Sequence, residues 1–175
     1  RKSLEDTVSR GFKSIKLGWR PFGRRDRKFD ELLVRTARET VGDSIELMID
    51  AGGSEQFWPH GLNWARETAK MLADFDIVWF EEALPPDDIA GHIELTKQSP
   101  VPIAAGEGDV TMYDFLDLID RGVHVVQPDV AFCGGLSVCA EVSRICQERQ
   151  RRCVPHCFST GINLAASLHW MAATD

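Results

Sequence analysis

The sequence lacks any apolar stretch approaching the roughly 20 residues that a membrane-spanning helix needs. It also lacks a basic excess, because 20 Lys and Arg stand against 27 Asp and Glu, for a net charge of -7. A protein that binds nucleic acid without sequence preference would be basic. We therefore expect neither a membrane nor a nucleic acid as a partner. Since no signal peptide and no initiator Met open the sequence, we expect the chain to begin inside a longer protein.

Cysteines are few and irregularly spaced. Their number, five, is odd, and they lack the short spacings of a disulfide scaffold. A reducing, cytoplasmic compartment fits this pattern best. Cys153, His156 and Cys157 form an alternative, a soft-metal cluster. No fourth ligand stands at zinc-like spacing, however, and adjacent residues on a strand point to opposite faces.

The chain does contain a repeated pattern, in which a helix-like stretch precedes a short apolar run. Helices are predicted over 28–42, 62–75, 87–98, 111–122 and 137–150, with a final one over 162–173. Strands are predicted over 13–17, 45–50, 76–81, 102–106, 123–127 and 152–156. Repeated βα units of this length predict an α/β fold with a parallel sheet and right-handed crossovers.

Polar residues close most of these apolar runs. Asp50, Glu81, Glu107, Asp129 and His156 follow one another at intervals of 31, 26, 22 and 27 residues. In a doubly wound sheet, functional residues cluster at one switch point. Convergence from successive strand ends is instead typical of a (β/α)₈ barrel. We therefore predict a partial TIM-type barrel of about six βα units, with two strands missing.

Three of these residues are hard oxygen donors. Asp50, Glu81 and Glu107 would repel one another at a common edge unless a cation lay between them. Carboxylates with open coordination positions suit Mg²⁺. For a single strand-end acid, a helix cap or a surface salt bridge is the better explanation. Three such acids at repeat spacing favour a magnesium site.

The remaining candidates are Lys16, Asp129 and His156. Lys16 ends the first predicted strand, where it would hold a substrate carboxylate or act as a base; the alternative is a surface lysine. Asp129 and His156 end neighbouring strands, so Asp129 can accept the ring N–H and raise the basicity of His156. The alternative is a buried histidine satisfied by a neighbouring acid. A base facing a divalent cation is suited to removing the proton next to a carboxylate.

Six segments together carry a resemblance: GFKSIKLGW, ELMIDAGG, WFEEALPPDD, VPIAAGE, QPDVAFCGGLS and VPHCFSTG. In order and spacing they resemble the mandelate racemase group of the enolase superfamily, whose sites use a Lys or His base with Mg²⁺. The resemblance implies that Asp50, Glu81 and Glu107 bind Mg²⁺, that Lys16 contacts the substrate carboxylate, and that Asp129 and His156 form the family's Asp–His dyad.

The same resemblance implies an N-terminal capping domain that selects the substrate, and a homo-oligomer. That domain and the first and last barrel strands are expected to be absent from residues 1–175, which would form an incomplete barrel domain of the C-terminal type (strands 2–7). We therefore expect the chain alone to be inactive.

One departure from the family pattern narrows the reaction. Gly18 stands where the family's Lys-x-Lys motif has its second Lys, the opposite-face base of racemases. A one-base reaction remains, in which His156 removes the α-proton of a sugar acid and then helps the β-hydroxyl to leave. Dehydration to a 2-keto-3-deoxy acid is the first hypothesis, with Arg20 binding a substrate hydroxyl or carboxylate. The alternatives are a racemase, epimerase or cycloisomerase of the same superfamily, and a non-catalytic barrel with a structural cation.

Overall fold

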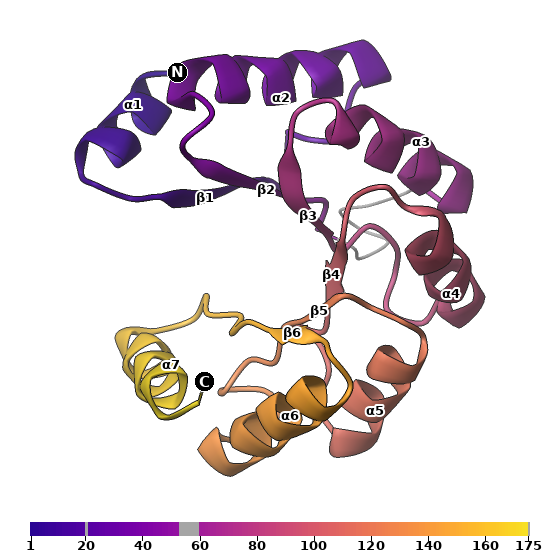
Figure 1. Cartoon of the computed structure of the whole chain (residues 1–175), viewed down its shortest axis with the longest axis vertical. Helices are drawn as coiled ribbons and strands as arrows, with labels where there is room; N and C mark the ends of the chain where they lie inside the picture. Colours follow the sequence, from indigo (N-terminus) through magenta and orange to yellow (C-terminus); the bar gives the residue numbers. More distant parts are fainter. Residues whose placement is uncertain (20, 53–59, 175) are drawn as a thin grey trace. The chain divides into compact units, whose positions relative to one another are not determined.

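Helices and strands alternate along the chain in this computed structural model, which describes residues 1–19, 21–52 and 60–174 (Figure 1). The helices in these residues are α1 (Lys2–Ser9), α2 (Arg27–Val41), α3 (Leu62–Ala73), α4 (Ile89–Gln98), α5 (Met112–Asp120), α6 (Leu136–Glu148) and α7 (Gly161–Ala173). The strands are β1 (Ser14–Gly18), β2 (Glu46–Asp50), β3 (Ile77–Glu81), β4 (Ile103–Ala105), β5 (Val125–Val126) and β6 (Arg152–Cys153).

These strands form one parallel sheet in the order β1-β2-β3-β4-β5-β6. Sequence order and spatial order coincide, as in a (β/α)₈ barrel and unlike a doubly wound sheet. The prediction of an α/β fold of the partial TIM-barrel type is confirmed.

Two details of the prediction were wrong. The helix α1 was not predicted. None of its residues is fully buried, and its apolar residues Leu4 and Val8 are partly buried against the core of the first unit, a stripe too short to mark a helix in the sequence. The strands β5 and β6 are shorter than predicted. Beyond them the ladder continues as single backbone hydrogen bonds, from Val154 N–H to Val126 O at 3.0 Å and from His156 N–H to Pro128 O at 3.1 Å, with a parallel bridge between Asp129 and His156. Pro128 itself has no N–H to donate.

Helix boundaries follow from capping side chains. The Asp26 carboxylate accepts the Phe29 N–H at 2.9 Å where α2 begins, and Asp88 accepts the Gly91 N–H at 2.9 Å where α4 begins. In α5, Thr111 and Asp114 form a capping box. Each cap satisfies an N–H that the first turn of a helix leaves without a partner, so these helices start within two residues of their predicted positions.

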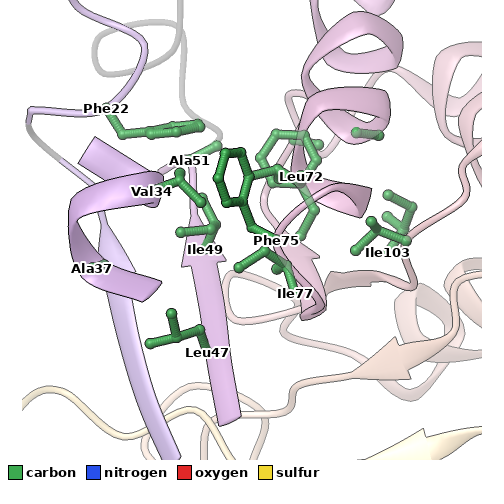
Figure 2. Packing of buried hydrophobic residues seen from close by; sticks show 14 of the residues in the cluster. Phe22, Val34, Ala37, Leu47, Ile49, Ala51, Leu72, Phe75, Ile77 and Ile103 are labelled. Carbon is green, nitrogen blue, oxygen red and sulfur yellow. The ribbon is translucent and has the colours of Figure 1, made fainter. Parts of the chain in front are cut away.

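The chain divides into two compact units, Arg1–Ile103 and Ala104–Asp175. In the first unit the helices lie on one side of β1, β2 and β3 (Figure 1). Alternation along β2 turns Leu47 and Ile49 toward this side, where both are fully buried. Figure 2 shows them packed near Val34 and Ala37 of α2. Burying each large aliphatic side chain contributes about 1.5–3 kcal/mol.

The second unit has its own core. Its buried cluster contains Val126 of β5, Phe115 of α5, Val142 of α6 and Trp170 of α7. Three thiols, Cys133, Cys139 and Cys146, are buried in the same cluster, and all five cysteines are free. A buried reduced cysteine packs as a small apolar residue, which explains these thiols without a disulfide scaffold.

Among the residues that the structure describes, no helix combines the length and the apolar character that spanning a bilayer would take.

Candidate active site

The first unit brings together Lys16, Asp50 and Glu81. Asp50 is the last residue of β2 and pairs in register with Glu81, the last residue of β3. A carboxylate oxygen of Asp50 and one of Glu81 lie within 4.8 Å of each other. The Lys16 ammonium reaches both: it donates to Glu81 Oε1 and lies 3.2 Å from Asp50 Oδ2. Lys16 lies in the middle of β1, not at its end as predicted, but its side chain faces this group.

Burial shifts the pKa values of the charged side chains in this group. The Glu81 side chain is fully buried and that of Asp50 is 13% exposed. Burial, followed by repulsion from Glu81, raises the pKa of Asp50 above its ordinary value. Burial also works against the charged form of Lys16, but attraction to Glu81 and Asp50 outweighs it, so the pKa of Lys16 is raised. The two acids therefore hold the Lys16 ammonium between them.

One further side chain fixes Glu81. Trp79 lies two residues earlier on β3 and therefore on the same face. Its indole N–H donates to Glu81 Oε2 at 2.8 Å, which leaves Oε1 for Lys16. Trp79 could not be singled out from the sequence, because a buried tryptophan is expected in any core.

Gly18 leaves no room for a side chain at the end of β1. Its φ is +124°, a conformation that L side chains rarely adopt, and a Cβ there would lie 2.2 Å from the backbone oxygen of Asp50. The next residue, Trp19, donates its N–H to that same oxygen. The close approach of β1 to β2 thus explains why glycine, and not a second lysine, follows Lys16 by two positions.

The second unit brings together Glu107, Asp129 and His156. Asp129 Oδ2 lies 2.7 Å from His156 Nδ1, so the hydrogen bond predicted between these strand ends is present. The other ring nitrogen, Nε2, lies 3.4 Å from Glu107 Oε2. The Asp129 side chain is fully buried and that of His156 is 15% exposed. With Nδ1–H donating to Asp129, Nε2 is the nitrogen that remains to exchange a proton.

Asn163 of α7 is a member of this group that sequence reasoning missed. Its amide donates to Asp129 Oδ1 at 3.0 Å and to Oδ2 at 3.2 Å. The available signal was the pair Asn163 and Ser167, two polar residues four apart in a mostly apolar stretch. A buried polar face on a helix of this kind needs polar partners.

Two further predictions concern Arg20 and the soft-metal cluster. Arg20 lies outside the described residues, so its substrate-binding role stays a prediction. In the described part of the chain, Cys153, His156 and Cys157 do not form a group with metal-ligand geometry. Cys153 instead accepts from Ser143 at 3.6 Å, and Cys157 is exposed. The structure thus gives the soft-metal alternative no support.

Comparison with known proteins places the chain in a family. The enolase C-terminal domain-like family model matches residues 1–175. A 3,6-anhydro-D-galactonate cycloisomerase from Zobellia galactanivorans is similar at 29% identity with a TM-score of 0.89, over 99% of this chain and 47% of that protein. A member of the enolase superfamily from Polaromonas sp. JS666 is similar at 31% identity with a TM-score of 0.87, over 99% of this chain and 44% of that protein.

A third similar structure contains a metal. A racemase from Streptomyces coelicolor A3(2) with bound magnesium shares 30% identity with a TM-score of 0.83, over 95% of this chain and 48% of that protein. The chain therefore spans less than half the length of each of these proteins.

Proposed function

Because the chain belongs to the enolase C-terminal domain-like family, we propose that it is the barrel part of a longer enzyme that removes the proton next to a carboxylate. The missing parts would be a capping domain and the first and last barrel strands. The proposed substrate is a small sugar acid, and the proposed product is its 2-keto-3-deoxy acid.

Asp50, Glu81 and Glu107 are the proposed Mg²⁺ ligands. The donor set fits, because all three are carboxylates and Mg²⁺ prefers oxygen ligands. The Lys16 ammonium between Asp50 and Glu81 supports a cation at this place. When bound, Mg²⁺ supplies positive charge that stabilises negative charge developing on the substrate carboxylate. Lys16 would bind the same carboxylate, and Arg20 a hydroxyl or carboxylate of the substrate.

The observation that carries the proposal is the 2.7 Å hydrogen bond between Asp129 and His156 Nδ1. It orients the ring and leaves Nε2 to take the α-proton, which gives an enediolate of the substrate. General-base action of this kind contributes about 10²–10⁴ in rate. The proton on Nε2 then passes to the β-hydroxyl, the C–O bond breaks, and water leaves. The resulting enol tautomerises to the 2-keto-3-deoxy acid.

Gly18 favours this one-base reaction over racemisation. A racemase needs a second base on the opposite face of the substrate, and the backbone around Gly18 has no space for a side chain. The similar cycloisomerase from Zobellia galactanivorans makes cycloisomerisation the second candidate, because that reaction too can proceed with one base.

The test is an assay of the longer protein that contains this chain, with Mg²⁺ and a panel of aldonic acids in D₂O. Formation of a 2-keto-3-deoxy product supports dehydration. Deuterium at the α-carbon without loss of water indicates a racemase or epimerase instead, and an isomeric cyclic product indicates a cycloisomerase. If no aldonic acid exchanges its α-proton, a non-catalytic barrel with a structural cation is the better account.

A variant of His156 and a surface control together test whether His156 is the base. His156→Asn should lower turnover by about 10²–10⁴, whereas Asn63→Leu on the surface of α3 should leave it unchanged. Turnover that survives His156→Asn would show that another residue is the base.

A further inference from the structure

The helix α7 buries two polar side chains and exposes several apolar ones. Its buried residues are Asn163, Ser167 and Trp170. Its exposed residues include Ile162 and Leu168, which are 83% and 56% exposed. An ordinary surface helix has the opposite arrangement. Something polar under α7 must therefore compensate for the burial of Asn163 and Ser167.

That polar partner is Asp129. Asn163 Nδ2 lies 3.0 Å from Asp129 Oδ1 and 3.2 Å from Oδ2, and 3.2 Å from Ser159 Oγ. At the other end of the amide, Ser167 Oγ donates to Asn163 Oδ1 at 3.3 Å. Because a donor meets Oδ1 and acceptors meet Nδ2, the amide has one favoured orientation. Its NH₂ group is held against the carboxylate.

The contacts divide the oxygens of Asp129 between partners. Oδ1 accepts the Ala131 N–H at 2.7 Å and the Asn163 amide. Oδ2 accepts the His156 ring at 2.7 Å, with Asn163 alongside. A buried carboxylate turns toward its donors, since leaving them costs the hydrogen bonds that compensate for desolvation. Asn163 therefore holds the Asp129 carboxylate in the orientation in which Oδ2 faces the His156 ring.

We propose that Asn163 is a positioning residue that acts through Asp129 to fix the tautomer and orientation of the His156 ring, with Ser167 holding the Asn163 amide in place. The catalytic meaning of this inference rests on the proposed function of His156 as the base. The contacts themselves do not depend on it. Asn163 is not a catalytic residue, because it touches Asp129 and not the ring.

The test reads the tautomer of His156 directly. Ring ¹⁵N resonances of the 175-residue chain distinguish the Nδ1–H from the Nε2–H form of the neutral imidazole. We expect the Nδ1–H form to predominate in the unaltered chain. Asn163→Leu removes both amide contacts with little change of volume, and should lower the ratio of Nδ1–H to Nε2–H about five- to tenfold. Ser167→Ala should lower it by a smaller factor. Asn63→Leu, on α3, should leave it unchanged.

An intact amide fingerprint with an unaltered tautomer ratio in Asn163→Leu would overturn the inference. If Asn163→Leu does not fold, Ser167→Ala decides, because loss of one hydroxyl leaves packing nearly intact; an unchanged ratio there overturns the inference as well. The result is independent of the proposed reaction. If the tautomer ratio changes in Asn163→Leu but the longer protein does not exchange an α-proton, the positioning role stands and the proposed reaction is wrong. If the longer protein does exchange the α-proton but the tautomer ratio is unchanged in Asn163→Leu, only the role of Asn163 is wrong.

Discussion

At the scale of single residues, the sequence was most informative where an ionisable side chain stands at the end of a predicted strand. Strand-end acids such as Asp50 and Glu81 were predictable, because an ionised side chain after a buried apolar run needs a specific reason. Asn163 was not, since its role depends on which side of α7 faces Asp129. The spacing of Asn163 and Ser167 indicates one face of the helix, but tertiary packing decides that this face meets Asp129.

Gly18 gives a residue-scale prediction about stability. Gly18→Ala should destabilise the fold by about 2–4 kcal/mol, because a Cβ would meet the Asp50 backbone oxygen and φ is positive. Gly108→Ala is the matched control, since nothing lies within 4 Å of a Cβ built there. Denaturant unfolding of the two variants measures the difference. Equal stabilities would mean that β1 and β2 are not in such close contact at Gly18.

Asp109 gives a prediction about pH. Burial, followed by repulsion from Asp114, raises the pKa of Asp109 to about 6. A carboxyl whose folded pKa is raised disfavours folding once it ionises, so its penalty grows from about pH 4 to pH 6 and is full above that. Asp109→Asn should therefore stabilise the fold at pH 7 by about 1–2 kcal/mol, after allowance for partial exposure.

The pH dependence is the critical readout for Asp109. Unfolding free energies of the wild type and Asp109→Asn should converge as pH falls below about 4. A stabilisation of equal size at pH 3.5 and pH 7 would show that it arises from something other than the charge.

At the scale of elements, helices were predicted more accurately than strands. Caps such as Asp88 and Thr111 mark helix starts locally, whereas strand length depends on pairing with neighbours distant in the sequence. The helix α1 shows the limit, since its apolar stripe consists of Leu4 and Val8 alone, which is too little for a periodic signal. The strands predicted over 123–127 and 152–156 are longer than β5 and β6, although single backbone hydrogen bonds continue the pairing as far as His156.

The capping box of α5 supplies a prediction at this scale. Thr111 Oγ1 accepts the Asp114 N–H, and Asp114 Oδ2 accepts the Thr111 N–H at 2.7 Å. Thr111→Ala removes the cap and should cost about 1 kcal/mol of unfolding free energy. Thr111→Ser keeps the hydroxyl and should retain most of it. Equal losses in the two variants would assign the effect to the threonine methyl group and not to the cap.

At the scale of the whole molecule, the βα repeat predicted the fold class because parallel strands need helical crossovers. The repeat also predicted that consecutive strand ends carry the chemistry. A magnesium site shared by Asp50, Glu81 and Glu107 stays a prediction, because these residues belong to two compact units with separate cores. The shared magnesium site is accordingly the central proposal and the point at which the account is most open to test.

Calorimetric titration of the chain with Mg²⁺ tests that site most directly. We predict one binding site that Asp50→Asn, Glu81→Gln and Glu107→Gln each weaken at least about tenfold, because each removes one charged ligand. Glu141→Gln, on the surface of α6, should bind Mg²⁺ like the unaltered chain. Wild-type affinity in Glu107→Gln, or the absence of any saturable binding, would contradict the three-carboxylate magnesium site.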